Sequence, residues 1–385
     1  MKQTMRAGAV LLAASMLAGG CGQWASRRAM ERGLAALHQG DNATAAKQFE
    51  RAARHVAVAD APALYYNLGT AEYNLGRLDD ARKAFETALE LAPGDRDSMV
   101  YLGQIHLKRQ EWSEAARLFE DAGAGRPPDA RLLVFLAEAA DGAGRRDAAR
   151  LYLIRALRAD RSYAPAVYDL ACLYRDKYML PVEALDGFEI FVRTADQQDA
   201  RVEKAKASIA RLKQVLEHMP PPVAPGVKRD LAAAQKLVAE GDRQRLARQS
   251  SKAEKAYHDA LTADPGSHDA TAGLGLVLKA KGDAAGALKM LLRAANLEPL
   301  RPTTMIEGAQ LAMGLKDYPT AARLLDRAIA RWPTQAPCYA WLAQVRHAEG
   351  HPAEARLYAA YYVLLAPAGA ERDRYEAWLR TLPES

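Results

Sequence analysis

Hydrophobic and small residues alternate with polar ones along this chain in a pattern typical of paired helices. Between residues 65 and 93 (YYNLGTAEYNLGRLDDARKAFETALELAP), apolar positions recur at helical spacing on both sides of Gly76. A glycine suits a helix end, and Pro93 cannot continue a helix. The stretch therefore predicts two helices joined by a turn, and the small residues Gly69 and Ala81 allow the two helices to approach closely.

The same pattern returns with a period of 34 residues over most of the chain. The second copy has Gly103 where the first has Gly69, and an upstream copy around Gly33 lies two residues out of phase, which indicates a small insertion. Prolines and alanines later in the chain keep the period: Pro265, Pro299, Pro333 and Pro367, and Ala253, Ala287, Ala321 and Ala355.

In these small residues and closing prolines the chain resembles the tetratricopeptide repeat family, from about residue 27 to 367. The resemblance implies an all-α fold, an α-solenoid of about nine helix–turn–helix repeats wound into a right-handed superhelix. A proline-rich stretch at 219–226 favours an extended, semi-rigid linker. The expected parts are a first block of about five repeats at 27–218 with a covering helix at 199–216, a second block of about four repeats at 227–367, and a capping helix at 368–385.

One segment of the second block departs from this regular pattern. Residues 243–250 (RQRLARQS) predict a basic insertion of about seven residues in the turn of the first repeat. The segment lacks the glycine-rich geometry of a phosphate-binding loop. We interpret it as a solvated insertion, and contact with an anionic partner or lipid headgroup is the alternative.

The first residues have the composition of an export signal. Lys2 and Arg6 make a basic start, and the uncharged run at 7–17 is too short to span a bilayer as a permanent helix. The sequence LAGGC, which ends at Cys21, resembles the lipobox of bacterial lipoproteins. That resemblance implies removal of a signal peptide at 1–20 and acylation of Cys21, for example with palmitate.

Further expectations follow from the same resemblance. Residues 21–26 would form a lipidated tether, and Gly22 stands where an aspartate would retain the protein at the inner membrane. We therefore expect a lipid anchor in the outer membrane, with the repeats facing the periplasm. An ordinary cleaved signal with an incidental cysteine is the alternative.

Composition and charge narrow the class of partner. The chain has 385 residues, half of them hydrophobic, and a formal net charge of +6. Removing Lys2 and Arg6 with the signal lowers this charge by two, which is too slight a surplus to indicate nucleic-acid binding. Besides Cys21, only Cys172 and Cys338 are present. They lie several repeats apart, so we expect two separate core thiols rather than a disulfide.

No motif in the sequence predicts catalysis, a cofactor or a metal. His347 and His351 are four residues apart, but Gly350 interrupts the helix that would align them on a metal. The glycines at 273–275 lie within a repeat helix with no strand before them, so they do not predict a dinucleotide site. We expect a protein that is not an enzyme.

The resemblance instead directs attention to the groove lined by the first helix of each repeat. In the family this groove takes an extended peptide or a partner's helix, and aromatic, hydrogen-bonding and charged groups suit that role. The first block would present Tyr66, Thr70, Tyr73, Gln104, Lys108, Arg131, Glu138, Asp141, Tyr168 and Arg175. The second would present Lys228, Gln235, Asp269, Lys279, Gln310, Gln344 and His347.

Taken together, these features predict a membrane-tethered scaffold that binds protein or peptide partners. Lipidated repeat proteins of this layout resemble pilotins of type IV pili and lipoproteins of the tight-adherence pilus system. That likeness implies a role in assembling an envelope complex, such as a pilus or secretion system, outer-membrane proteins or cell-wall machinery. The alternatives are an accessory or regulatory arm of a cell-wall enzyme and a soluble adaptor without lipid.

Overall fold

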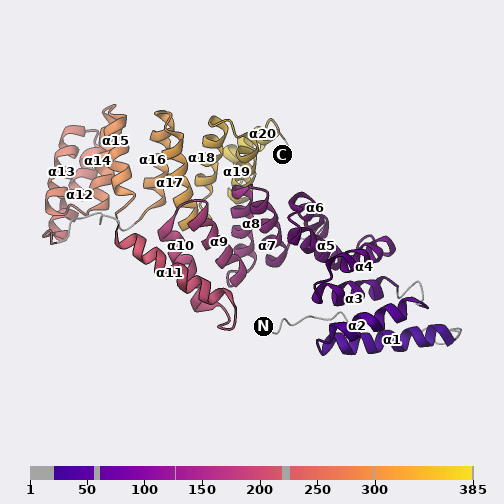
Figure 1. Cartoon of the computed structure of the whole chain (residues 1–385). Helices are drawn as coiled ribbons and strands as arrows, with labels where there is room; N and C mark the ends of the chain where they lie inside the picture. Colours follow the sequence, from indigo (N-terminus) through magenta and orange to yellow (C-terminus); the bar gives the residue numbers. More distant parts are fainter. Residues whose placement is uncertain (1–20, 56–60, 126, 219–225, 298–299, 384–385) are drawn as a thin grey trace. The chain divides into compact units, whose positions relative to one another are not determined.

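The structure, a computed structural model, describes residues 21–55, 61–125, 127–218, 226–297 and 300–383. Every regular element over these residues is an α-helix (Figure 1). The expected signal at 1–20 and most of the expected linker, 219–225, lie outside the described residues. The helices are α1 (Cys21–His38), α2 (Asn42–Ala53), α3 (Ala61–Asn74), α4 (Leu78–Leu91), α5 (Arg96–Lys108), α6 (Trp112–Gly123), α7 (Ala130–Gly142), α8 (Arg146–Ala159), α9 (Ala164–Asp176), α10 (Pro181–Thr194), α11 (Arg201–Glu217), α12 (Leu231–Leu246), α13 (Ser250–Ala263), α14 (His268–Ala280), α15 (Ala284–Ala294), α16 (Pro302–Gly314), α17 (Tyr318–Arg331), α18 (Ala336–Ala348), α19 (Pro352–Leu365) and α20 (Ala370–Leu379).

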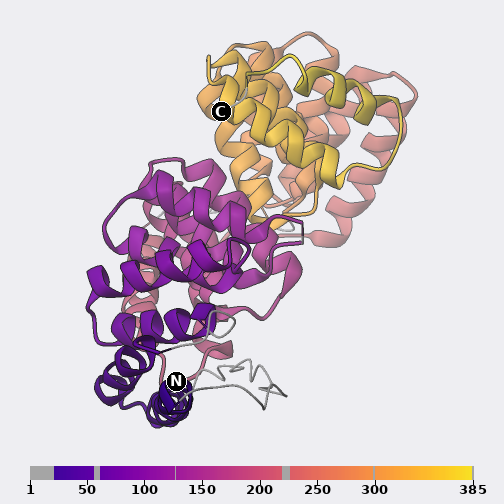
Figure 2. The same ribbon diagram turned by 90° about the vertical axis from the view of Figure 1, so that its right-hand side faces the viewer.

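The helices pair as consecutive hairpins, as the 34-residue period predicts (Figures 1 and 2). In the described part of the chain there are nine such pairs, from α1 with α2 to α18 with α19, and α11 and α20 stand outside the pairs. The all-α repeat fold is therefore confirmed. The covering helix expected at 199–216 begins at Arg201, because Asp199 accepts a hydrogen bond from the Arg201 backbone N–H.

The chain divides into two compact units. The first comprises Met1–Leu170 with Ile190–Val202, and the second comprises Ala171–Glu189 with Glu203–Ser385. We describe each unit by itself. The boundaries of the two blocks predicted from sequence stay predictions.

In four of the hairpins, an aromatic ring of the second helix packs against a glycine of the first. A Cβ added at Gly69 would lie 2.8 Å from the ring of Phe85, and one added at Gly103 would lie 2.5 Å from the ring of Phe119. Both phenylalanines are fully buried. The small residue is therefore required by close packing of the two helices. The same pairing joins Gly33 to Phe49 and Gly241 to Tyr257.

The alanines that keep the period are buried at the same interfaces. Those at 253, 287, 321 and 355 are all fully buried. Five turns between paired helices use a glycine at positive φ, such as Gly76 (φ 76°), which is the left-handed conformation that glycine adopts without strain. In the other four turns the residue at positive φ is Gln110, Met179, Arg248 or Lys316. The next helix then begins after a capping residue, as Asp41 accepts from the Thr44 backbone N–H ahead of α2.

Two expectations about local structure differ from what is observed. The expected insertion at 243–250 is wrong: Arg243 and Arg245 belong to α12, and the turn before α13 comprises only residues 247–249. The regular period explains this, since Gly241 and Tyr257 keep the spacing of the other glycine–aromatic pairs. Residues 22–26, expected as a tether, form the first turns of α1, and the buried Ser26 hydroxyl donates to the Ala52 carbonyl oxygen.

The C-terminal helix α20 folds back on the last hairpin, as the sequence predicts. Tyr375 is 5% exposed, packs on Tyr362 at 4.5 Å between ring centroids, and donates to the Ala340 carbonyl oxygen. The helix thus covers apolar surface that the final repeat would otherwise leave open. Among the described residues, no helix combines the length and the apolar character that crossing a membrane requires.

Candidate functional site

The first helices of the unit 1 hairpins bring a group of tyrosines together. Tyr66 and Tyr73 on α3 both contact Tyr101 on α5 edge to face, with ring centroids 5.9 and 5.3 Å apart. Tyr101 in turn stacks on the buried ring of Phe85 at 4.9 Å. We call Tyr66, Tyr73 and Tyr101 the aromatic cluster. All three side chains are half-buried, so they are held in place and still reach the surface.

Polar groups surround the aromatic cluster. The Tyr73 hydroxyl donates to Oε1 of Gln104 at 3.3 Å, and the Lys108 ammonium lies 4.0 Å from the centre of the Tyr73 ring. The Thr70 hydroxyl donates to the Tyr66 carbonyl oxygen. Burial raises the pKa of Tyr66 and of Tyr101, so both phenols stay protonated at neutral pH and can donate hydrogen bonds. The predicted residues Tyr66, Thr70, Tyr73, Gln104 and Lys108 therefore lie together.

Farther along the first helices, carboxylates gather. Burial raises the pKa of Asp169 on α9 to about 6, and the charges of Glu138 and Asp141 on α7 act in the same direction. The guanidinium of Arg201 opposes this shift. We call Glu138, Asp141 and Asp169 the acidic cluster. Burial also raises the pKa of Glu138.

Aromatic rings flank the acidic cluster too. The guanidinium of Arg201 lies 5.6 Å from the ring of Tyr168 and pairs with Asp199 at 2.6 Å. Arg131, which the sequence predicted, lies over the Phe135 ring at 5.5 Å. Burial raises the pKa of Tyr101 and of Tyr163, and the positive charge of Arg131 opposes this rise at both phenols. We call the whole face, from Tyr66 to Asp169, the first-helix surface of unit 1.

Sequence reasoning missed three residues of this surface, Tyr101, Asp169 and Arg201. The repeat period contained a signal for two of them. Counting in steps of 34 from Asn67 gives Tyr101, Phe135 and Asp169, so one register position contributes to the surface in four successive repeats. Arg201 belongs to α11, which lies outside the repeat pattern, and the period therefore gave no sign of it.

In unit 2 the predicted residues are more dispersed. Gln235 and Asp269 line a hollow of about 350 Å³ between α12 and α14, together with Asp242 and the buried His268. Asp269 also pairs with Arg301 at 2.9 Å. The other predicted residues of this part are Lys228, which is exposed, Lys279, which pairs with Glu307 at 2.6 Å, and Gln310, which is half-buried.

Three predicted residues contact other parts of the chain. Gln344 donates to the Tyr375 hydroxyl at 2.5 Å, and the His347 ring packs edge to face on Trp378 at 5.5 Å, so both lie against α20. Arg175 donates to the Ser208 hydroxyl at 2.6 Å and pairs with Asp176. These residues stabilise the packing of α20 and α11.

The described residues contain no group of His, Cys, Asp and Glu side chains arranged to hold a metal ion. Cys338 is a buried thiol outside any disulfide. Burial raises the pKa of the Cys338 thiol to about 12, so very little reactive thiolate exists at neutral pH.

Comparison with known proteins agrees with the repeat pattern. The profile of the tetratricopeptide repeat family matches residues 30–96, 66–130 and 238–302. Similar solved structures include residues 41 to the end of MamA from Desulfovibrio magneticus RS-1, at 23% identity, with 48% of this chain and 100% of that chain covered and a TM-score of 0.42. Another is YrrB, described as a TPR protein with an unusual peptide-binding site, at 17% identity, with 66% and 91% covered and a TM-score of 0.30.

A search of curated proteins gives no match. The family profile nevertheless matches parts of the chain in both units, and the period of small residues and the helical hairpins extend that pattern along the chain. The chain carries tetratricopeptide repeats at residues 30–130 and 238–302, in both units.

Proposed function

We propose that this protein is a non-catalytic scaffold whose first-helix surface in unit 1 binds an extended peptide or a helix of a partner protein. A lipid on Cys21 holds the scaffold at the outer membrane on the periplasmic side, where it serves the assembly of an envelope complex. The tetratricopeptide repeat fold itself supports protein or peptide partners. The observation that carries the proposal is the aromatic cluster and its polar neighbours.

The chemistry of the first-helix surface suits a peptide. Tyrosine side chains offer large contact areas with few rotatable bonds, and they are enriched among the residues that dominate binding energy. Here the edge-to-face contacts with Tyr101 already fix the rings of Tyr66 and Tyr73. A partner would therefore lose little side-chain entropy of the scaffold on binding. Gln104 and Lys108 are in position to bind main-chain or carboxylate groups of that partner.

The surroundings of Cys21 support the lipid anchor. Cys21 is the first residue of α1, and Trp24 is 65% exposed one turn later. Arg28 lies over the Trp24 ring at 5.2 Å, and Arg27 is exposed beside it. An exposed tryptophan with neighbouring arginines is suited to the headgroup region of a membrane. Acyl chains contribute about 0.8 kcal/mol for each buried methylene, so two or three chains would anchor the protein stably.

Binding at the first-helix surface is tested by recovering crosslinked partners from intact membranes. We expect the triple variant Tyr66→Ala/Tyr73→Ala/Arg131→Ala to lose proteins that the wild type retains. Glu50→Lys, at an exposed position of α2, is the control and should retain them. The proposal fails if the triple variant is folded by circular dichroism and recovers the same partners as the wild type.

The anchor is tested separately with labelled palmitate. The wild type should incorporate the label and fractionate with outer membranes, and Cys21→Ser should do neither. Absence of label in the wild type, with no change in fractionation for Cys21→Ser, would remove the anchor from the proposal and leave the binding surface intact.

A further inference from the structure

Unit 1 also contains a hollow, which lies between the second helices α4 and α6. None of the residues that line it belongs to the aromatic or the acidic cluster. The volume of the hollow is about 520 Å³, which is room for two or three side chains. Leu89, Leu102 and Leu118 line it, and they belong to the core cluster of this part of the molecule. Leu102 and Leu118 are buried, whereas Leu89 is only partly covered. We call this the second-helix hollow.

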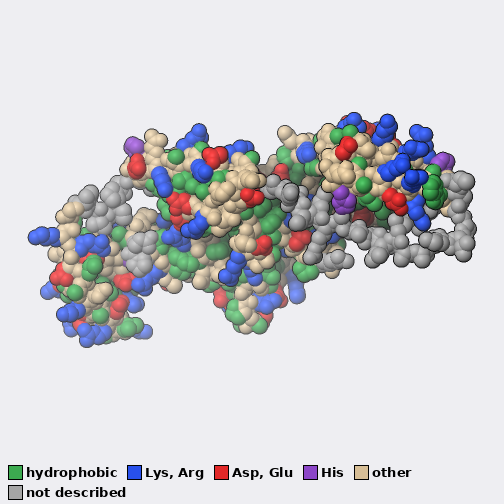
Figure 3. Space-filling model, turned by 90° about the horizontal axis from the view of Figure 1, so that it is seen from below, with side chains coloured by type: hydrophobic (Ala, Val, Ile, Leu, Met, Phe, Trp, Pro, Cys, Tyr) green, Lys and Arg blue, Asp and Glu red, His purple; other side chains and the backbone are tan. Residues whose placement is uncertain are grey.

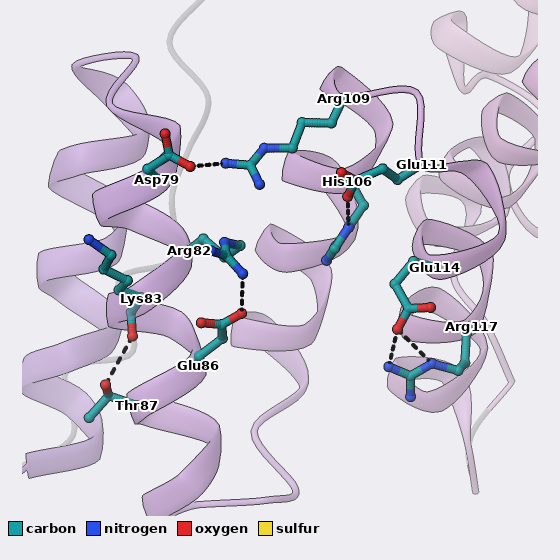
Figure 4. A network of polar contacts seen from close by, with 10 residues as sticks. All are labelled: Asp79, Arg82, Lys83, Glu86, Thr87, His106, Arg109, Glu111, Glu114 and Arg117. Carbon is teal, nitrogen blue, oxygen red and sulfur yellow. Dashed lines mark hydrogen bonds and ion pairs between the residues drawn. The ribbon is translucent and has the colours of Figure 1, made fainter.

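Three carboxylates and one guanidinium form the rim of the second-helix hollow: Glu86 and Glu90 on α4, and Glu114 and Arg117 on α6. Figure 4 shows how two of the carboxylates are held. Arg82 pairs with Glu86 at 3.1 Å, and Arg117 pairs with Glu114 at 2.6 Å. Glu90 is exposed and makes no ion pair with any residue of the described chain.

His106 closes one end of the hollow and is itself held by a carboxylate. Its Nδ1 atom hydrogen-bonds to Glu111, as Figure 4 shows. The hollow and the residues that hold it therefore carry more negative than positive charge. This contrasts with the formal surplus of +6 over the whole chain, and with the face in Figure 3, where basic and acidic side chains are interspersed.

Several residues of the hollow do not recur in the next repeat. A shift of 34 residues replaces His106 by Ala140, Glu90 by Ala124 and Arg117 by Leu151. Leu151 is buried in that repeat, whereas Arg117 is exposed. Repeat packing alone therefore does not require His106, Glu90 and Arg117 at this one place.

We propose that the second-helix hollow binds a partner protein through a segment that carries leucine-sized apolar side chains flanked by lysine or arginine. The apolar side chains would cover Leu89 and the edges of Leu102 and Leu118. The flanking cations would pair with Glu90 and with the rim carboxylates of Glu86 and Glu114. This site is distinct from the first-helix surface, so the scaffold could hold two partners on two faces of unit 1.

The test uses a labelled peptide probe and the full-length protein. The probe is a fluorescein-labelled peptide, KLLKGKLLK, and its binding is followed by fluorescence anisotropy at 50 mM NaCl. Two matched peptides replace every lysine by glutamate or every leucine by serine. We expect the wild type to bind the first peptide at least tenfold more tightly than either matched peptide.

The position of binding is tested with single charge reversals. Glu90→Lys should weaken binding of the probe at least tenfold, because it places a cation where the probe's lysine must lie. Glu50→Lys, an equally exposed charge reversal on α2, should change the affinity less than twofold, and so should Tyr66→Ala/Tyr73→Ala.

The proposal is overturned if the probe does not bind the wild type, if the glutamate peptide binds as well as the lysine peptide, or if Glu50→Lys weakens binding as much as Glu90→Lys. Loss of binding in Tyr66→Ala/Tyr73→Ala instead would assign the probe to the first-helix surface. That result would support the proposed function while rejecting the second site.

Discussion

The ring of Phe85 lies against the backbone of Gly69 so closely that a Cβ atom at position 69 would be 2.8 Å from three ring carbons. Real Cβ contacts are longer than this, and Phe85 is fully buried, so its ring has no free space to move into. The pair fixes the distance between α3 and α4.

We predict that Gly69→Ala destabilises unit 1. Alanine favours a helix over glycine by about 1 kcal/mol, but overpacking a core costs about 1 to 3 kcal/mol. The difference gives a net loss of up to about 2 kcal/mol in the free energy of unfolding, measured by urea denaturation followed by circular dichroism. Gly314→Ala is the control, because a Cβ there meets no atom within 4 Å. An equal effect at both positions would contradict the packing argument.

The repeat fold could be predicted from sequence because steric requirements are strict at a few positions. Gly69, Gly103 and Gly241 each meet an aromatic ring, and a small residue, glycine or alanine, stands at the corresponding position of other hairpins, as Ala137 and Ala171 show. The helix boundaries were less predictable, as Arg243 and Arg245 show. Basic residues fit both an exposed helix end and a loop, so their composition alone could not decide between the two.

The candidate site was predictable only in part. Tyr66 and Tyr73 were found from register alone, but their contact with Tyr101 depends on how α3 and α5 pack. Gln344 was predicted for an open groove and instead binds Tyr375, because α20 covers that end. The second-helix hollow could not be predicted, since it depends on the space that α4 and α6 leave over α5.

We predict that the Tyr375 hydroxyl stabilises the docking of α20. It accepts a hydrogen bond from Gln344 at 2.5 Å and donates one to the Ala340 carbonyl oxygen at 3.0 Å. Tyr375→Phe would leave both groups without this partner and should cost about 1 to 3 kcal/mol. Tyr375→Ala would also lose the ring and should cost about 3 to 5 kcal/mol.

Chemical denaturation of both variants tests this order, and limited proteolysis should release the C-terminal segment faster from Tyr375→Ala. Trp24→Ala, at an exposed position of unit 1, serves as a comparison for loss of an aromatic side chain. If Tyr375→Phe were as stable as the wild type, the hydroxyl would have no structural role.

We predict that the Cys338 thiol resists modification in the native protein. Cys338 is fully buried, and burial raises its pKa to about 12, so both access and thiolate formation are disfavoured. Iodoacetamide at pH 8 followed by peptide mass spectrometry should label Cys338 only after unfolding in urea. Rapid labelling of Cys338 without denaturant would contradict the burial of α18 in the core.

The last prediction concerns the pH dependence that Asp169 confers. Burial raises the pKa of its carboxyl to about 6 in the native protein, whereas an unfolded aspartate has a pKa of about 3.9. Between these values the native state binds more protons than the unfolded state, so the free energy of unfolding falls as the pH rises from about 4 to about 6. Above that window the ionised Asp169 costs the fold about 1 to 3 kcal/mol, an amount that the positive charge of Arg201 has already reduced.

The variant Asp169→Asn removes this cost. Its free energy of unfolding, relative to that of the wild type, should therefore be higher at pH 7.5 than at pH 4. Urea denaturation across this range gives the measurement, and Glu50→Gln, at an exposed site, should show no such change. A constant difference between Asp169→Asn and the wild type at all pH values would mean that Asp169 ionises in the folded protein as it does in water.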